Sequence, residues 1–241
     1  MKTENQAETG ADTGEEAAKT AILQAALPLV PFDGWSDQTF RAAVADSGVA
    51  SGLAKALFPR GGIDLALGYH RQGDTRMTER LAGEDLSVMR YSARVAHAIR
   101  ARLDLVQDKE LVRRGTTLFA LPQHAAEGAK AIWGTADAIW KALGDSSEDF
   151  EWYSKRATLS AVYGSTVLFW LGDDSPGHAA TWAFLDRRIE NVMQVEKLKA
   201  GLRDNPVVSA LRKGPFSGVF DRVGSLRKPQ SQDDLPGHGR G

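Results

Sequence analysis

Apolar side chains recur along most of the chain at spacings of three and four residues, which places them on one face of an α-helix. The clearest series lies in the interval 85–106 and comprises Leu86, Met89, Ala93, Ala96, Ile99, Leu103 and Val106. A second series lies between Trp182 and Met193. Period-two alternation, which is typical of β-strands, is nearly absent. The pattern therefore predicts an all-α fold over about residues 20–200.

Capping residues predict where these helices begin and end. Ser175 followed by Pro176 predicts a helix start, because a serine oxygen accepts from free amides and proline suits the first helical position. Ser36, Ser51, Asp108 and Gly144 mark further boundaries. Together the signals predict nine helices, at about 18–27, 36–46, 51–57, 61–80, 85–106, 109–120, 125–143, 149–172 and 176–200.

The lengths of the predicted helices divide the chain into regions. The first three are short, which is typical of a three-helix unit with a helix-turn-helix, and they cover residues 20–60. The six longer ones predict a helical bundle over 61–200, and this combination is the architecture of TetR-type regulators. Residues 1–19 lack a large apolar side chain after Met1 and predict a disordered leader. Residues 201–241 form a basic tail.

Composition excludes several kinds of chemistry. The chain has 241 residues, a formal net charge of −1 and no cysteine, so disulfides, thiolate zinc sites and thiol catalysis are excluded. It contains no nucleophile elbow, phosphate-binding loop or dinucleotide fingerprint. His124 and Glu127 form a single His-x-x-Glu pair, whereas a di-iron bundle requires two Glu-x-x-His motifs and two further glutamates. Asp173 and Asp174 suit the turn between two helices better than a cation site. We expect a non-catalytic protein without metal or cofactor.

Charge argues against DNA binding by the three-helix unit. Residues 21–60 carry three basic side chains, Arg41, Lys55 and Arg60, against three aspartates. DNA-binding modules neutralise phosphates with a basic stripe and read base edges with Arg, Asn or Gln. The second helix of the motif, 51–57, offers only Lys55. The sequence predicts a degenerate helix-turn-helix, and a TetR-type transcriptional regulator with a hydrophobic ligand remains the alternative.

Two segments bear on the relation to membranes. The most apolar run, 157–171, is shorter than the roughly 20 residues that cross a bilayer, and the acidic N-terminus fits no secretory signal or mitochondrial presequence. We therefore expect a bacterial cytoplasmic location. In the tail, 215–226 places five apolar residues within an arc of about 120°, which predicts an amphipathic helix on anionic lipid: Phe216, Val219, Phe220, Val223 and Leu226. Because Gly218 and Gly224 weaken a helix, docking on the body or disorder stays open.

Four motifs carry a resemblance to a known family. They are PFDGW at 31–35, FPRGGIDL at 58–65, WYSKRATLSAVYGST at 152–166 and TWAFLDRRIE at 181–190. In this order they resemble the coenzyme Q biosynthesis accessory lipid-binding proteins, over about residues 20–200. Since the acidic N-terminus fits no mitochondrial presequence, we expect the resemblance to be to the bacterial branch of that family.

The resemblance implies a function as well as a fold. It implies a TetR-like homodimer that binds no nucleic acid, holds an isoprenoid quinone intermediate and presents it to demethoxyubiquinone hydroxylase. It also implies peripheral association with the inner membrane, where the 215–226 segment matches the family's membrane helix. Trp182 matches the tryptophan of the family's partner-binding patch, and Leu185 lies one turn further. A core position for Trp182 is the alternative, since it also opens the apolar series.

A polyprenyl tail gains about 0.8 kcal/mol for each buried CH₂, so a carrier must offer a comparably apolar cavity. We predict that six residues line it: Leu118, Leu121, Trp133, Leu159, Val162 and Tyr163. The small residues Gly164 and Ser165 beside Tyr163 fit either such a cavity or a close approach of two helices.

Overall fold

The computed structural model describes the backbone of residues 4–203 and the side chains of residues 14–148 and 151–194. All regular elements in this part are helical, which confirms the predicted all-α class. In chain order they are α1 (Glu4–Ala26), α2 (Val30–Asp33), α3 (Asp37–Ser47), α4 (Ser51–Leu57), α5 (Gly62–Ala82), α6 (Tyr91–Asp104), α7 (Lys109–Phe119), the 3₁₀ turn η1 (Pro122–His124), α8 (Ala125–Ala142), α9 (Asp149–Leu171), the 3₁₀ turn η2 (Pro176–His178) and α10 (Ala179–Arg203).

Several predicted caps form as the sequence indicates. The Ser36 hydroxyl accepts from the Thr39 amide at 3.1 Å and starts α3, and Gly48 ends this helix in the left-handed conformation at φ 70°. The Asp108 carboxylate accepts from the Glu110 amide at 2.8 Å and starts α7. These bonds satisfy groups that a helix end otherwise leaves free.

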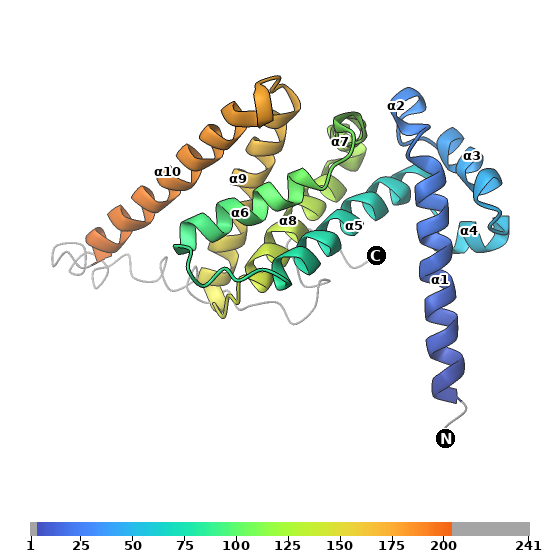
Figure 1. The fold of residues 1–241 in the computed structure, drawn as a ribbon, viewed down its shortest axis with the longest axis horizontal. Helices are drawn as coiled ribbons and strands as arrows, with labels where there is room; N and C mark the ends of the chain where they lie inside the picture. Colours follow the sequence, from blue (N-terminus) through green and yellow to red (C-terminus); the bar gives the residue numbers. More distant parts are fainter. Residues whose placement is uncertain (1–3, 204–241) are drawn as a thin grey trace, which may run out of the picture. The chain divides into compact units, whose positions relative to one another are not determined.

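The first compact unit comprises residues up to Thr75 together with Leu105–Ala131. In it, α1 packs against α3 and α4, as Figure 1 shows, around a core that contains Ile22, Phe40 and Phe58. Helix α7 belongs to this unit because Leu111 lies in the same core and its carbonyl accepts from Trp35 Nε1 at 3.0 Å. The first compact unit therefore extends beyond residue 60, where the sequence placed a boundary, and includes α7.

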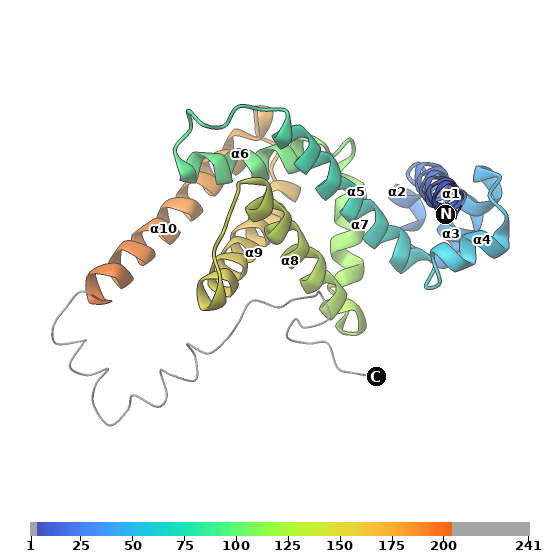
Figure 2. The ribbon, with the colours of Figure 1, turned by 90° about the horizontal axis from the view of Figure 1, so that it is seen from below.

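The second compact unit comprises Arg76–Asp104 together with the chain from Ile132 onward. Helix α10 packs against α6 and α9 in it (Figure 2). Large side chains from separate helices are fully buried here, among them Met77, Ile99, Ile139 and Leu185. This unit holds most of the predicted lipid and partner residues.

Helix α1 begins at Glu4, so the expectation of a disordered leader over 1–19 is wrong for its helical part. Ala, Gln, Glu and Lys are good helix formers, and the segment continues a helix that Ala18 and Ile22 anchor in the core. Helix α2, four residues with Pro31 in its first turn, was not predicted. Residues 215–226, the predicted membrane helix, lie outside the described residues, as does most of the predicted tail.

Two helices start later than the sequence predicts. The predicted 85–106 helix begins at Tyr91, because the Asp85 carboxylate accepts from the Ser87 amide at 2.9 Å and diverts the backbone into a turn. The predicted helix at 176 opens as η2, and α10 begins at Ala179. Gly177 and His178 have φ of 61° and 56°, which no α-helix contains, although Ser175 Oγ still accepts from the Ala180 amide at 3.0 Å.

Candidate lipid and partner site

The predicted lipid residues of the second unit lie on α8 and α9. Leu159, Val162 and Tyr163 of α9 are buried, and Trp133 of α8 is half-buried. The Trp133 ring lies 5.9 Å from the ring of Trp152, centre to centre, within the range of favourable aromatic contact. The structure therefore brings these two helices together through an aromatic contact that involves one predicted residue.

The two remaining lipid candidates belong to the first unit. Leu118 is half-buried and packs against the core of that unit. Leu121 lies between α7 and η1 and keeps 42% of its surface exposed. Four of the six candidates thus share one unit and two lie in the other.

Sequence reasoning missed an aromatic cluster around Trp152. Tyr153 meets Trp152 edge to face at 4.9 Å and lies 6.4 Å from Trp133. The indole Nε1 of Trp152 is buried and has no hydrogen-bond partner among the described residues, and the same holds for Ser160 Oγ, two turns further along α9. A buried donor without a partner is costly, so such groups suit a carbonyl-bearing ligand.

The glycine beside Tyr163 faces helix α8. A Cβ at Gly164 would lie 3.7 Å from Ile132 Cδ1 of α8, which is ordinary van der Waals contact. Ser165 Oγ donates to the Val162 carbonyl of its own helix at 3.0 Å. Gly164 thus faces α8 with room for a methyl group, so the spacing of the two helices does not require glycine here.

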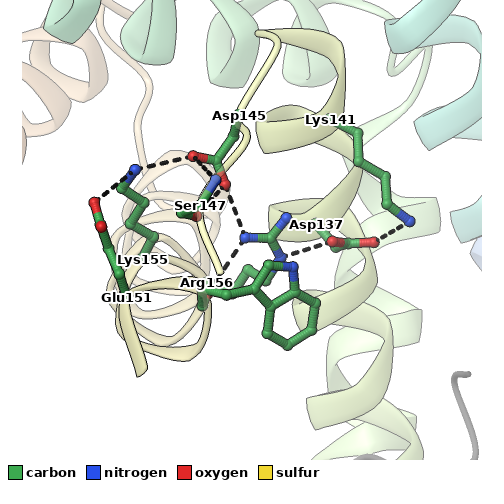
Figure 3. A network of polar contacts seen from close by, with 8 residues as sticks. Asp137, Lys141, Asp145, Ser147, Glu151, Lys155 and Arg156 are labelled. Atoms are coloured by element: carbon green, nitrogen blue, oxygen red, sulfur yellow. Dashed lines mark hydrogen bonds and ion pairs between the residues drawn. The ribbon is translucent and has the colours of Figure 1, made fainter. Parts of the chain in front are cut away.

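A buried ion-pair network fixes α9 against α8 and the loop between them (Figure 3). Arg156 has only 1% of its side chain exposed; its Nε donates to Asp137 at 2.7 Å and its Nη1 donates to Asp145 at 3.1 Å. The Arg156 guanidinium also lies 4.2 Å from the centre of the Trp152 ring, a cation–π contact. The network thus holds the aromatic cluster in place.

The charge of Asp145 is strongly stabilised. Burial alone would raise the pKa of this carboxyl, but hydrogen bonds from Ser147 (2.6 Å), Lys155 (2.9 Å) and Arg156 lower its pKa to about 2. The carboxylate therefore stays ionised at every physiological pH. Its function here is to position α9 rather than to transfer protons.

Two open grooves in the described part of the chain bear on the prediction, and neither is lined by the six predicted lipid residues. One, of about 580 Å³, lies between α3 and α4 and is lined by Phe40, Val44 and Val49 with the cations Arg41 and Lys55. The other, of about 640 Å³, lies between the ends of α5 and α8 and is lined mainly by small residues. The residues of the lipid cavity stay a prediction.

The predicted partner residue Trp182 lies partly exposed near the start of α10. Its Nε1 donates to the Gly177 carbonyl at 2.8 Å, the Arg100 guanidinium lies 5.4 Å from its ring centre, and the His178 ring meets it edge to face. Leu185 is fully buried, so it packs in the core and offers no surface to a partner. Its prediction as a partner-binding residue is corrected accordingly.

Apolar residues of α9 and α10 other than Trp182 also reach solvent, and the sequence pattern did not single them out. Phe169 of α9 stacks on Phe184 of α10 with ring centres 4.6 Å apart. Leu168 beside it is exposed. We call Leu168, Phe169, Trp182 and Phe184 the α9–α10 surface; aromatic residues of this kind are enriched in protein interfaces.

The Asp173 carboxylate caps the first turn of α10 and is not arranged to hold a cation. Its carboxylate accepts from the Ser175 amide at 2.9 Å and from the amide of Thr181, also at 2.9 Å. The hydrogen bonds from Ser175 and Thr181 hold the pKa of Asp173 well below its ordinary value. This carboxylate positions the helix that carries Trp182.

Glu127, the candidate metal partner of His124, pairs instead with Arg60 at 3.1 Å within the first unit. Within the described residues, no three His, Asp or Glu side chains cluster as a metal site would require. No helix in that part of the chain is long and apolar enough to cross a membrane.

Comparison with known proteins bears on this arrangement. The COQ9 family model matches residues 125–196. The chain is 32% identical over 188 residues to ubiquinone biosynthesis protein COQ9, mitochondrial, of Drosophila melanogaster, which covers 76% of this chain and 57% of that protein. The Homo sapiens protein of that name is 31% identical over 189 residues, 75% of this chain and 59% of the relative. The chain is a relative of the COQ9 proteins. It spans about three fifths of their length.

The fold has a solved counterpart. The crystal structure of the TetR transcriptional regulator from Nitrosomonas europaea superposes with a TM-score of 0.58, at 20% identity, over 71% of this chain and 95% of that one. The predicted TetR-like fold is therefore confirmed. The COQ9 match at 125–196 falls on α8, α9 and the first part of α10, which carry the aromatic cluster, the ion-pair network and Trp182.

Proposed function

We propose that this chain is a non-catalytic accessory protein of ubiquinone biosynthesis. In this proposal it binds an isoprenoid quinone intermediate and presents it to demethoxyubiquinone hydroxylase at the membrane surface. The observation that carries the proposal is the relation to the COQ9 proteins, at 31–32% identity over three quarters of the chain. It works as a homodimer, uses no catalytic cofactor and associates peripherally with the inner membrane.

The aromatic cluster on α8 and α9 supports lipid binding. The rings of Trp133, Trp152 and Tyr153 form an apolar aromatic cluster, and Trp152 Nε1 is a buried donor without a partner among the described residues. A quinone ring has a flat apolar face and carbonyl acceptors, so it matches both features. Its polyprenyl tail requires apolar side chains alone.

The α9–α10 surface supports a protein partner. Trp182 presents part of its ring to solvent, while Asp173 and the Gly177 carbonyl fix its position. Large rigid aromatic residues are typical anchors of an interface. By contrast, the exposed side of α4 offers a single cation, Lys55, which favours an accessory protein over the alternative of a DNA-binding regulator.

Lipid extraction from the purified full chain, with mass spectrometry, tests the carrier function. We expect isoprenoid quinones or their precursors in a ratio approaching one per chain, and a loss of about tenfold or more in Trp133→Asp. The control is Trp133→Phe, which keeps an aromatic ring and should retain the lipid. Unchanged lipid content in a folded Trp133→Asp variant would overturn the assignment of this wall.

A pull-down with demethoxyubiquinone hydroxylase tests the partner surface. We expect Trp182→Lys to lose the hydroxylase and Trp182→Phe to retain it. Phe32→Lys serves as the matched control, because Phe32 is 83% exposed and belongs to the first unit. Equal recovery of hydroxylase by all three variants would overturn the role of Trp182.

A further inference from the structure

The loop between α5 and α6, residues 83–90, projects two apolar side chains into solvent. Val88 is 86% exposed and Met89 is 36% exposed. Apolar residues at a loop tip are unusual because turns normally carry small polar residues. Neither residue contributes to the lipid or partner candidates described above.

The tip is held in shape by side chains from both flanking helices. Arg94 of α6 donates to the carbonyls of Ser87 and Met89, each at 3.0 Å. At the other end, Glu84 pairs with Arg80 of α5 at 3.1 Å and with His97 of α6. The loop is therefore a braced turn.

Bracing also satisfies the polar backbone groups of the tip. The Ser87 amide donates to Asp85, and the Met89 amide donates to the Leu86 carbonyl at 3.1 Å. Together with the Arg94 bonds, these contacts pair the amides of Ser87 and Met89 and the carbonyls of Leu86, Ser87 and Met89. Inserting backbone into a lipid surface is costly mainly when amides and carbonyls lose their hydrogen bonds to water and gain no other hydrogen bond. These bonds reduce that cost for the tip.

The residues that flank the tip suit an interface between water and lipid. Arg90 is exposed and makes no ion pair with any described residue, so its charge is available to an anionic headgroup. Tyr91 is 44% exposed and stacks on Trp140 with ring centres 5.7 Å apart. Tyrosine with an apolar body and a polar tip is enriched at that depth of a membrane.

We infer that residues 83–90 form a membrane-insertion tip that places Val88 and Met89 in an anionic lipid surface. This adds a contact in the helical body to the membrane association proposed for residues 215–226, and it rests on the protein working at a membrane. A protein partner is the less fitting occupant, because two projecting side chains offer little area for a stable interface.

The absence of cysteine allows a direct test. Val88→Cys in the full chain creates one labelling site for an environment-sensitive dye such as NBD. With phosphatidylglycerol-containing vesicles we expect a blue shift, and quenching by lipids that carry a spin label in the acyl chain. Phe32→Cys, equally exposed but in the first unit, should show neither effect.

A sedimentation assay with the same vesicles measures the contribution of the tip. Val88→Asp with Met89→Asp should weaken vesicle binding about tenfold, since two partly inserted side chains are lost. Binding equal to that of the unaltered chain, or a label at position 88 that stays in water while the protein sediments, would overturn the inference. If the label inserts but Trp133→Asp keeps its lipid, the tip stands and the carrier proposal fails.

Discussion

Replacing Asp145 with asparagine removes the central charge of the network between α8 and α9. Asp145 has 2% of its side chain exposed and accepts from Ser147, Lys155 and Arg156. Asparagine preserves the shape but leaves the buried Arg156 with Asp137 as its single carboxylate. We expect the second compact unit to lose stability at neutral pH.

The expected loss follows from the pKa of Asp145. It falls from an ordinary value of 3.8 to about 2, and at 1.36 kcal/mol per pKa unit this corresponds to about 2.5 kcal/mol of stabilisation of the charged form. Asparagine resembles the neutral form and leaves a buried cation less well paired, so the loss at pH 7 should be about 2–4 kcal/mol. The folded pKa is depressed, so this stability is present above pH 4 and lost as the pH falls towards 2.

Urea unfolding followed by tryptophan fluorescence measures the effect, because Trp152 contacts Arg156 directly. The difference in unfolding free energy between the unaltered chain and Asp145→Asn should be constant from pH 7 to 5 and shrink between pH 4 and 2. Asp104→Asn is the matched control, since Asp104 is exposed in the same unit. A cost below about 1 kcal/mol at pH 7, or a cost that does not change with pH, would refute the reasoning.

Four further substitutions test other parts of the fold. Gly62→Ala should destabilise the protein by about 1–3 kcal/mol in urea unfolding, because the added Cβ would lie 2.6 Å from the Trp35 carbonyl oxygen. Gly134→Ala should instead stabilise α8 by about 0.5–1 kcal/mol, because nothing lies within 4 Å of the added Cβ. Trp35→Phe should cost about 1–2 kcal/mol, since the buried bond from the indole to the Leu111 carbonyl is lost; no change in the midpoint would contradict this. Asp173→Asn should lower the melting temperature and speed amide exchange at the start of α10, and unaltered exchange would contradict its capping role.

The helical periodicity of the sequence predicted most of the fold because each helix buries one continuous face. Helix α4 forms at 51–57 as predicted, and α7 and α8 differ from prediction by one residue at an end. Prediction failed where side chains compete for backbone groups. Around 85–90 the apolar spacing continues through Leu86 and Met89, but Asp85 and Arg94 take hydrogen bonds that a helix needs. Periodicity contains no information about that competition.

The candidate site was less predictable than the fold. Trp182 was selected through a family motif, and its exposure depends on the turn at Gly177 that no periodicity encodes. Leu185 shares its helix face in the sequence pattern yet is fully buried. The pairing of Arg156 with Asp137 and Asp145 joins residues 19 and 11 positions apart, and only the folded arrangement of α8 and α9 brings them together. Charged residues in an apolar series are the signal that would have pointed to this network.

In the helix-turn-helix of the first unit, the residues that set the backbone shape differ from those that would contact DNA. Its shape depends on buried residues such as Phe40, Ala54 and Phe58 and on the left-handed Gly48, all of which face the core or the turn. DNA reading depends on the exposed side chains of α4, where this chain has Lys55 among small and apolar residues. Selection can therefore alter the exposed residues without disturbing the core. A TM-score of 0.58 to a regulator consequently reports a shared fold, and a function must be argued from the residues on the surface.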